Sequence, residues 1–125
     1  MKEFMLLIRN SGEQKDNMPE EEHKKFLDGC RNYIDDLKKN GKLIAAQPLV
    51  REGKIISGTP GKWKEEDFNS SEEVQVGYYH ILANDLEEAI SIAKRNPEFV
   101  FSSTAKIEVR PVKMKEQTTG FVYPK

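Results

Sequence analysis

Residues 74–97 read VQVGYYHILANDLEEAISIAKRNP, and this stretch decides the fold because it joins a strand to a helix. The apolar and aromatic run over residues 74–82 predicts a long strand. Asn84 or Asp85 then caps a helix, with Glu87 or Glu88 at the reciprocal third position of a capping box. Asn96-Pro97 ends the helix, whose apolar stripe consists of Leu86, Ala89, Ile90 and Ala93.

The N-terminal third of the chain has the same order, a strand followed by a helix. Residues 4–9, FMLLIR, form a short apolar run between two charges, which is typical of a buried strand. Pro19, followed by three glutamates, predicts the start of a helix, and Asn40-Gly41 predicts its end. One apolar stripe runs along this helix through Leu27, Cys30, Ile34 and Leu37, with Phe26 and Tyr33 beside it.

The remaining segments complete a single domain over residues 1–113. Residues 43–50 and 54–58 are strand-like, and the short connection Arg51-Glu52-Gly53 is typical of a hairpin between them. Residues 59–73 contain few apolar side chains and predict a loop, whereas the alternation over residues 104–112 predicts a last strand. We expect residues 114–125 to form a tail that packs on the domain or on a dimer partner.

The order of elements predicts an α+β fold, the ferredoxin-like sandwich. Two strand–helix–strand halves with right-handed crossovers give an antiparallel sheet with two helices on one face, to which the predicted hairpin adds one strand. The first strand is nevertheless apolar on both sides, since Phe4, Leu6 and Ile8 alternate with Met5 and Leu7. The fourth strand is also apolar on both faces, with Val74, Val76 and Tyr78 on one and Tyr79 and Ile81 on the other. The helix-free face is therefore covered either by a second copy of the chain or by the tail through Phe121 and Tyr123.

Composition narrows the class of protein. The 125 residues carry 20 basic and 21 acidic side chains, so the net charge of −1 provides no general attraction for nucleic acid or anionic lipid. No apolar run is long enough to span a bilayer, and no secretory signal is evident, so we expect a cytoplasmic protein. Cys30 is the only cysteine, which excludes an internal disulfide and a cysteine-based zinc site.

Several strings of the sequence resemble one known family. They are FMLLIR, KKNGKLIAAQPLV, VGYYHILANDLEEAISIAKRNP and IEVRPV, and together they span residues 3 to about 113. The chain resembles the YCII-related family, and within it the branch of DGPF-domain proteins. Where that branch has Asp-Gly-Pro-Phe, this chain has Glu65-Glu66-Asp67-Phe68, so that only Phe68 matches. The resemblance implies a dimeric α/β barrel, and cofactor-free hydrolytic or elimination chemistry on small organic acids by a His and a carboxylate.

His23 is the first candidate for that chemistry. Its helical position falls within the arc of the apolar stripe, so we expect the imidazole to face the sheet in a half-buried cleft. The helix dipole in the first turn disfavours the imidazolium, which suits a general base. The resemblance also implies a functional His in the first helix. The alternative is a histidine at the edge of the core that bonds a backbone carbonyl.

Carboxylate partners for His23 come from the predicted loop. Glu65 and Asp67 are placed to assist catalysis if this loop covers the cleft as a lid, and otherwise they belong to a solvated acidic loop. No ligand spacing relates the two histidines, so no metal site is predicted. No cofactor motif is present either.

Five residues form the predicted substrate-binding set. Arg9 and Arg110, at the ends of strands, can present guanidinium forks to a carboxylate, or they merely keep edge strands soluble. Trp63 either covers a ligand or anchors its loop. Tyr79 and His80 project from opposite faces of the fourth strand, and His80 has the alternative role of an interface residue.

Three functions are compatible with these features. The first is a homodimer that binds a small anionic organic molecule between helix and sheet, with acid–base chemistry by His23. The second is a non-catalytic binding or regulatory module that uses the same pocket or the dimer surface. The third is an assembly domain whose exposed sheet makes the contacts.

Overall fold

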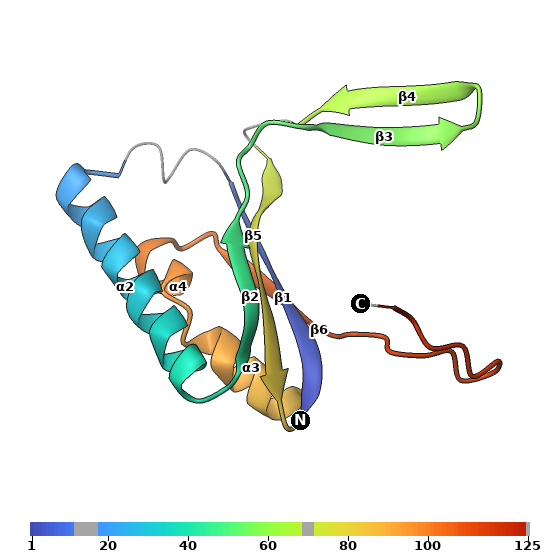
Figure 1. Cartoon of the computed structure of the whole chain (residues 1–125). Helices are drawn as coiled ribbons and strands as arrows, with labels where there is room; N and C mark the ends of the chain where they lie inside the picture. The colour runs from blue at the N-terminus through green and yellow to red at the C-terminus, as the bar shows by residue number, and fades with distance from the viewer. Residues whose placement is uncertain (12–17, 69–71, 125) are drawn as a thin grey trace.

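The computed structural model describes residues 1–11, 18–68 and 72–124, and its body is a four-stranded antiparallel sheet with helices on one face (Figure 1). The strands are β1 (Lys2–Ser11), β2 (Leu43–Pro48), β5 (Glu73–Ala83) and β6 (Lys106–Pro111), in the spatial order β2-β5-β1-β6. This order and the antiparallel pairing agree with the predicted ferredoxin-like arrangement.

The helices are α2 (Glu20–Lys39), α3 (Leu86–Lys94) and the short α4 (Glu98–Phe101). Two helices were predicted, and α4 is the addition. It begins directly after Pro97, which ends α3 and at the same time provides a fixed φ for the start of another turn. The edge-to-face contact of Phe101 with Phe26, with ring centroids 5.6 Å apart, packs α4 against α2.

The core lies between the sheet and the helices. Phe4, Leu6 and Ile8 of β1 are 0–4% exposed, as their alternation with Met5 and Leu7 predicts. Leu37 of α2 joins this cluster, and so do the apolar side chains of β5 and α3, namely Val76, Tyr79, Ile81, Ala83, Ala89, Ile92 and Ala93.

A β-bulge changes the predicted faces of β5. The register passes from Ile8 opposite Gly77 to Arg9 opposite Gln75, so Val76 is the extra residue. Alternation is broken there, and Val76 is buried on the same side as Tyr79. The prediction that Val74 and Val76 share a face with Tyr78 is therefore wrong.

The predicted hairpin of residues 43–50 with residues 54–58 is also wrong. β2 pairs with β5, whereas β3 (Lys54–Thr59) pairs with β4 (Lys62–Asp67) in a separate two-stranded sheet. Pro60-Gly61 makes the tight turn, with Gly61 at φ +84°, the conformation that the second central position of a type II turn requires. The supposed loop over residues 59–73 thus contains a strand, and Arg51-Glu52-Gly53 leads the chain out of the main sheet.

The β3–β4 hairpin and the C-terminal residues project from the body on the side away from the helices (Figure 1). Both strands of the hairpin are exposed along their whole length. The C-terminal residues fold back on themselves through a bridge between Lys115 and Val122. None of the described helices is long and apolar enough to cross a lipid bilayer.

Candidate functional site

A cleft of about 460 Å³ lies between α2 and the part of the sheet formed by β2 and β5. It follows α2 from Phe26 to Lys38, which are about 18 Å apart along the helix axis. Its walls are mainly apolar, with side chains from Ile8, Phe26, Leu27, Cys30, Ile34, Ala46, Pro48 and Val76. A space of this size and character suits a small organic molecule.

Small residues on the sheet side leave this space. Ala46 of β2 pairs with Tyr79 of β5 and presents only a methyl group to α2. Gly77, one residue after the bulge, has no side chain, and β2 approaches it so closely that an added Cβ would lie 3.1 Å from the carbonyl oxygen of Gln47. Ala46 and Gly77 therefore leave a hollow on the sheet side of the cleft, between the larger side chains of Val76 and Tyr79.

Tyr79 contributes a polar side chain to the inner wall of the cleft, and Tyr33 of α2 packs against it without lining the cleft. Tyr79 is 7% exposed, and its ring meets that of Tyr33 edge to face with centroids 5.3 Å apart. Burial raises the pKa of Tyr79 to about 12 and also raises the pKa of Tyr33, which donates a hydrogen bond to the carbonyl oxygen of Ile92 at 2.7 Å. Both phenols are thus neutral hydrogen-bond donors at physiological pH.

Glu98 brings a carboxyl group to the same wall. Its residue is only 5% exposed, although it belongs to the short helix α4 and lines the cleft. Asn96 positions the start of this helix, because its side-chain oxygen accepts a hydrogen bond from the backbone N–H of Glu98 at 2.9 Å. The cleft therefore contains a group that can exchange a proton with a bound molecule.

The outer lip of the cleft is charged. Arg31, Asp35 and Lys38 of α2 are one helical turn apart, they line the cleft, and all three are exposed. Two cations and one anion at this lip favour a ligand that carries a negative group at its exposed end.

His23 does not line this cleft. Its side chain is exposed, and it borders a shallow depression formed only by residues of α2, which are Glu20, Glu21, His23, Lys24 and Leu27. The expectation that His23 faces the sheet is wrong, because the buried stripe of α2 begins at Phe26 and the first turn lies before it. Leu27 belongs to both spaces, so His23 lies near the mouth of the cleft.

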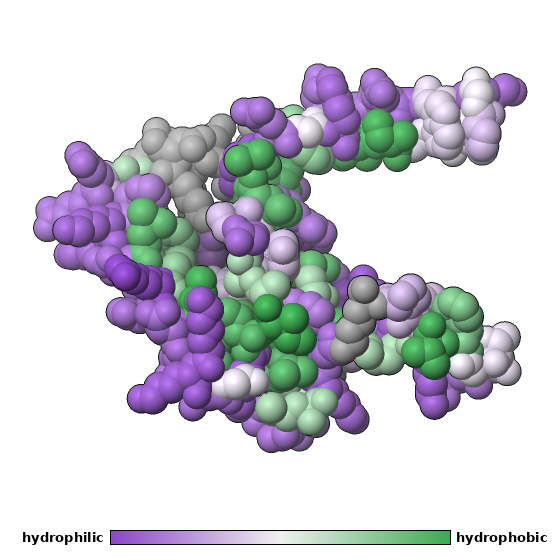
Figure 2. Space-filling view, viewed as in Figure 1, coloured by the Kyte–Doolittle hydropathy of each residue, from purple (hydrophilic) through white to green (hydrophobic). Residues whose placement is uncertain are grey.

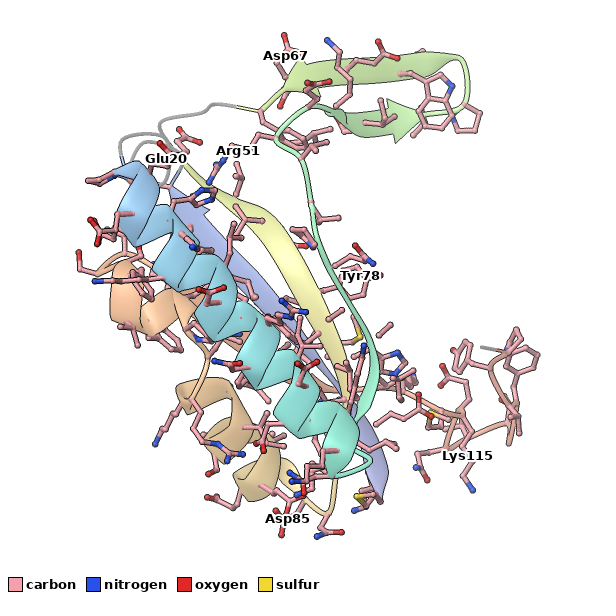
Figure 3. The ribbon with its side chains drawn as sticks, turned by 60° about the vertical axis from the view of Figure 1, so that its left-hand side comes forward. Glu20, Arg51, Asp67, Tyr78, Asp85 and Lys115 are labelled. Carbon is pink, nitrogen blue, oxygen red and sulfur yellow. The ribbon has the colours of Figure 1, made fainter. Side chains whose placement is uncertain are left out.

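Glu65, Asp67 and Trp63 lie on β4 in the projecting hairpin. Asp67 pairs with Lys54 on the neighbouring strand, and Trp63, which is 61% exposed, lies opposite Gly58. In Figure 3 Asp67 is at the root end of the hairpin, and Glu20 is at the start of α2. The structure does not bring these acidic residues together with His23, and none of the three lines the cleft.

Arg9, His80 and Arg110 lie on the helix-free face. Arg9 forms ion pairs with Glu73 at 3.2 Å and with Glu108 at 3.6 Å, and Arg110 pairs with Glu108 at 3.6 Å. His80 Nε2 is 2.7 Å from a carboxylate oxygen of Glu3, whose side chain is 8% exposed. Of the predicted substrate-binding set, only Tyr79 therefore lines the cleft.

Sequence reasoning missed Glu98, Arg31 and Lys38 as residues of the cleft. Arg31 and Lys38 lie seven residues apart, and their spacing places them on one edge of the apolar stripe, which was a usable signal. Glu98 gave no such signal, since a glutamate after Pro97 also fits an exposed turn. Across the described ranges, no three His, Cys, Asp or Glu side chains gather in a way that could hold a metal ion.

Comparison with known proteins identifies one family. The family model of the YCII-related domain matches residues 3–115, which is nearly the whole chain. The comparison with curated proteins finds no match.

Proposed function

Since the chain belongs to the YCII-related family, we propose that it binds a small organic acid in the cleft between α2 and the sheet and acts on it without a cofactor. The finer features of the proposal are membership of the DGPF-domain branch, a dimeric α/β barrel and a cytoplasmic location. The motifs quoted above support the branch, and the two-sided apolar strand β1 supports the dimer.

The observation that carries the proposal is the cleft itself, an apolar space between helix and sheet with Arg31, Asp35 and Lys38 at its lip and the buried carboxyl group of Glu98 inside. An apolar body fits between Ile34 and Val76, while a carboxylate at the exposed end meets Arg31 and Lys38. Medium-sized carboxylic acids combine these two properties.

Acid–base chemistry is the second part of the proposal, and Glu98 is its base. A carboxylate inside an apolar cleft can take a proton from a carbon next to a carbonyl group, leaving an enolate that neutral donors such as Tyr79 stabilise. The proton returns from Glu98 to the same carbon or is replaced by one from solvent. His23, near the mouth of the cleft, is the competing base.

Binding is tested with octanoate as the probe. We expect octanoate to raise the midpoint of thermal unfolding, by a stabilisation of about 2.7 kcal/mol at a hundredfold excess over Kd. It should also slow the reaction of Cys30, the only cysteine, with N-ethylmaleimide, because Cys30 lines the cleft. Lys38→Glu should weaken both effects. Lys39→Glu, the same charge change one residue further along α2, is the matched control.

The thermal midpoint reports whether octanoate binds, and the reactivity of Cys30 reports whether it binds in the cleft. Stabilisation without protection of Cys30 would place octanoate elsewhere on the protein. Equal loss of affinity in Lys38→Glu and Lys39→Glu would mean that the lip of the cleft does not hold the carboxylate. Either result contradicts the proposed site.

Catalysis is tested by the exchange of solvent deuterium into C3 of 2-oxooctanoate, followed by proton NMR. Wild type should accelerate this exchange, and Glu98→Gln should abolish the acceleration while Cys30 remains protected by octanoate. Loss of exchange in His23→Ala instead would assign the base to His23. Loss of the accelerated exchange in His80→Gln alone would place the catalytic base on the helix-free face.

Assembly through the helix-free face is the second candidate function. The observation that favours it is a group of half-buried apolar side chains with no helix over them, namely Met5, Leu7, Tyr78 and Leu82. A second copy of the chain would bury them in a symmetric contact. Sedimentation velocity tests this candidate alone, because a monomeric chain would contradict assembly and would leave ligand binding in the cleft unaffected.

A further inference from the structure

Two arms extend from the body over the helix-free side of the sheet (Figures 1 and 2). The hairpin arm consists of β3 and β4, and the C-terminal arm consists of residues 113–124. Within the described part of the chain, β3 and β4 pair only with each other, and an isolated two-stranded hairpin is at best marginally stable in water. Such an arm needs a surface to pack against, and its own body does not provide one.

Exposed apolar side chains concentrate on these arms and on the residues where the hairpin arm leaves the body. Among the described residues, ten of the sixteen large apolar side chains that are exposed fall within residues 49–68 and 114–123. They include Trp63 at 61% and Phe121 at 56% exposure. Single exposed apolar residues are ordinary, but a concentration of this kind marks an interaction surface.

A hollow of about 550 Å³ lies at the root of the hairpin arm. Leu49, Val50, Ile55 and Phe68 form its apolar wall, and Arg51 lies among them. One guanidinium nitrogen of Arg51, Nη2, donates to the carbonyl oxygen of Ser11 at 3.4 Å, whereas Nη1 is buried and has no hydrogen-bond acceptor among the described residues. This root hollow therefore has space for apolar groups and an unused donor for a carbonyl or carboxylate oxygen.

The C-terminal arm has the complementary chemistry. The rings of Phe121 and Tyr123 meet edge to face with centroids 5.2 Å apart, and Lys113 Nζ lies 5.9 Å from the centre of the Tyr123 ring. The Tyr123 hydroxyl donates to the carboxylate of Glu116. These contacts, with the bridge between Lys115 and Val122, hold an exposed aromatic pair in place on a segment that folds back on itself.

The arm cannot fill the root hollow of its own chain in this arrangement. It leaves the sheet after β6, at the end opposite to the hairpin, as the labels Lys115 and Arg51 show in Figure 3. Because β6 and β2 are opposite edges of the sheet, the start of this arm and the root hollow lie at opposite corners of the sheet. A two-fold axis in the plane of the helix-free face, perpendicular to the line that joins these two corners, exchanges them. The C-terminal arm of one copy then lies at the root of the other copy's hairpin.

We propose that the arms clasp a second copy of this chain, with the aromatic pair of each C-terminal arm seated in the root hollow of the other copy. The inference rests on the proposed assembly through the helix-free face. Charged groups on that face do not oppose it, because they have partners within each chain: Glu73 pairs with Arg9 and Lys106, Glu108 pairs with Arg9 and Arg110, and the Glu3 carboxylate lies 2.7 Å from His80 Nε2.

Sedimentation velocity of the full chain tests the proposal first. Wild type should be a dimer, and Phe121→Asp should raise the dissociation constant at least tenfold. Val100→Asp is the matched control, because Val100 is an equally apolar, 78% exposed residue on α4, away from the arms. A monomeric wild type would overturn the assembly itself. A dimer that persists unchanged in Phe121→Asp would overturn only the role of the arms.

Cysteine pairing tests where the arm docks. In a Cys30→Ser background, one chain carries Val50→Cys in the root hollow and a second, of distinguishable mass, carries Val122→Cys on the C-terminal arm. Mild oxidation of the mixture should link the two different chains. Replacing the second chain by one with Val100→Cys should remove this product. A dimer without the mixed Val50–Val122 link would overturn docking in the root hollow.

Discussion

Asp85 fixes the start of α3 through its side chain. Its Oδ1 accepts a hydrogen bond from the backbone N–H of Glu88 at 2.8 Å, and the Glu88 carboxylate accepts one from the N–H of Asn84 at 3.1 Å. We expect Asp85→Ala to lower the free energy of unfolding by about 1 kcal/mol, measured by urea denaturation. Glu87→Ala, in the same first turn, is the control, and an equal loss there would contradict a capping role.

Tyr79 predicts how stability changes in alkaline solution. Its pKa is raised to about 12 by burial, whereas an unfolded chain ionises tyrosine near pH 10. Between these values the folded state holds a proton that the unfolded state releases, so stability falls as pH rises. Tyr79→Phe should reduce this fall by about 1.4 kcal/mol per pH unit in urea denaturation curves. Tyr78→Phe, on the half-exposed side of β5, is the comparison, and identical slopes in wild type and Tyr79→Phe would contradict the assignment.

For some single residues, the sequence alone was enough to predict the role of the side chain. The capping pair at Asp85 and Glu88 was among the predicted alternatives, because capping depends on residues three positions apart. The position of His23 could not be predicted by the same means. Helical angle alone gives the direction of a side chain, but burial depends on whether another element lies opposite that turn.

The hairpin arm depends on its turn. Gly61, at φ +84°, follows Pro60, and a β-branched side chain there costs about 1–2 kcal/mol. We expect Gly61→Val to remove the ordered amide signals of β3 and β4 from the NMR spectrum while those of the main sheet stay unchanged. Loss of both sets together would mean that the arm and the body fold as one unit.

At the scale of elements, local patterns predicted helices and strands better than they predicted pairing. α2, α3, β1 and β5 follow from periodicity and end signals in the sequence. The partner of β3 did not follow, since a glycine-containing connection of three residues can join two strands or lead out of a sheet. The Pro60-Gly61 turn was the stronger signal, and it lay in a stretch that was too polar to indicate a strand.

At the scale of the whole molecule, the sheet separates two surfaces with different properties. The helix-covered face contains the cleft, in which Ala46 and Gly77 leave space. The opposite face carries paired charges and half-buried apolar groups between the arms. The two-sided character of β1 predicted the second surface, and a cleft between helix and sheet was also predicted. The residues that line the cleft could not be predicted in full, because they depend on the bulge at Val76 and on the place of α4.

This separation predicts that ligand binding and assembly are independent. Lys38 and Phe121 lie on opposite sides of the sheet and share no partner, so the effects of Lys38→Glu and Phe121→Asp should add. Phe121→Asp should leave the protection of Cys30 by octanoate unchanged, and Lys38→Glu should leave the sedimentation coefficient unchanged. The double variant should show the weaker protection of Cys30 and the weaker dimer, each to the same extent as in the single variants. If dissociation of the dimer also abolished protection of Cys30, the second copy would have to shape the cleft, and the two surfaces would form a single site.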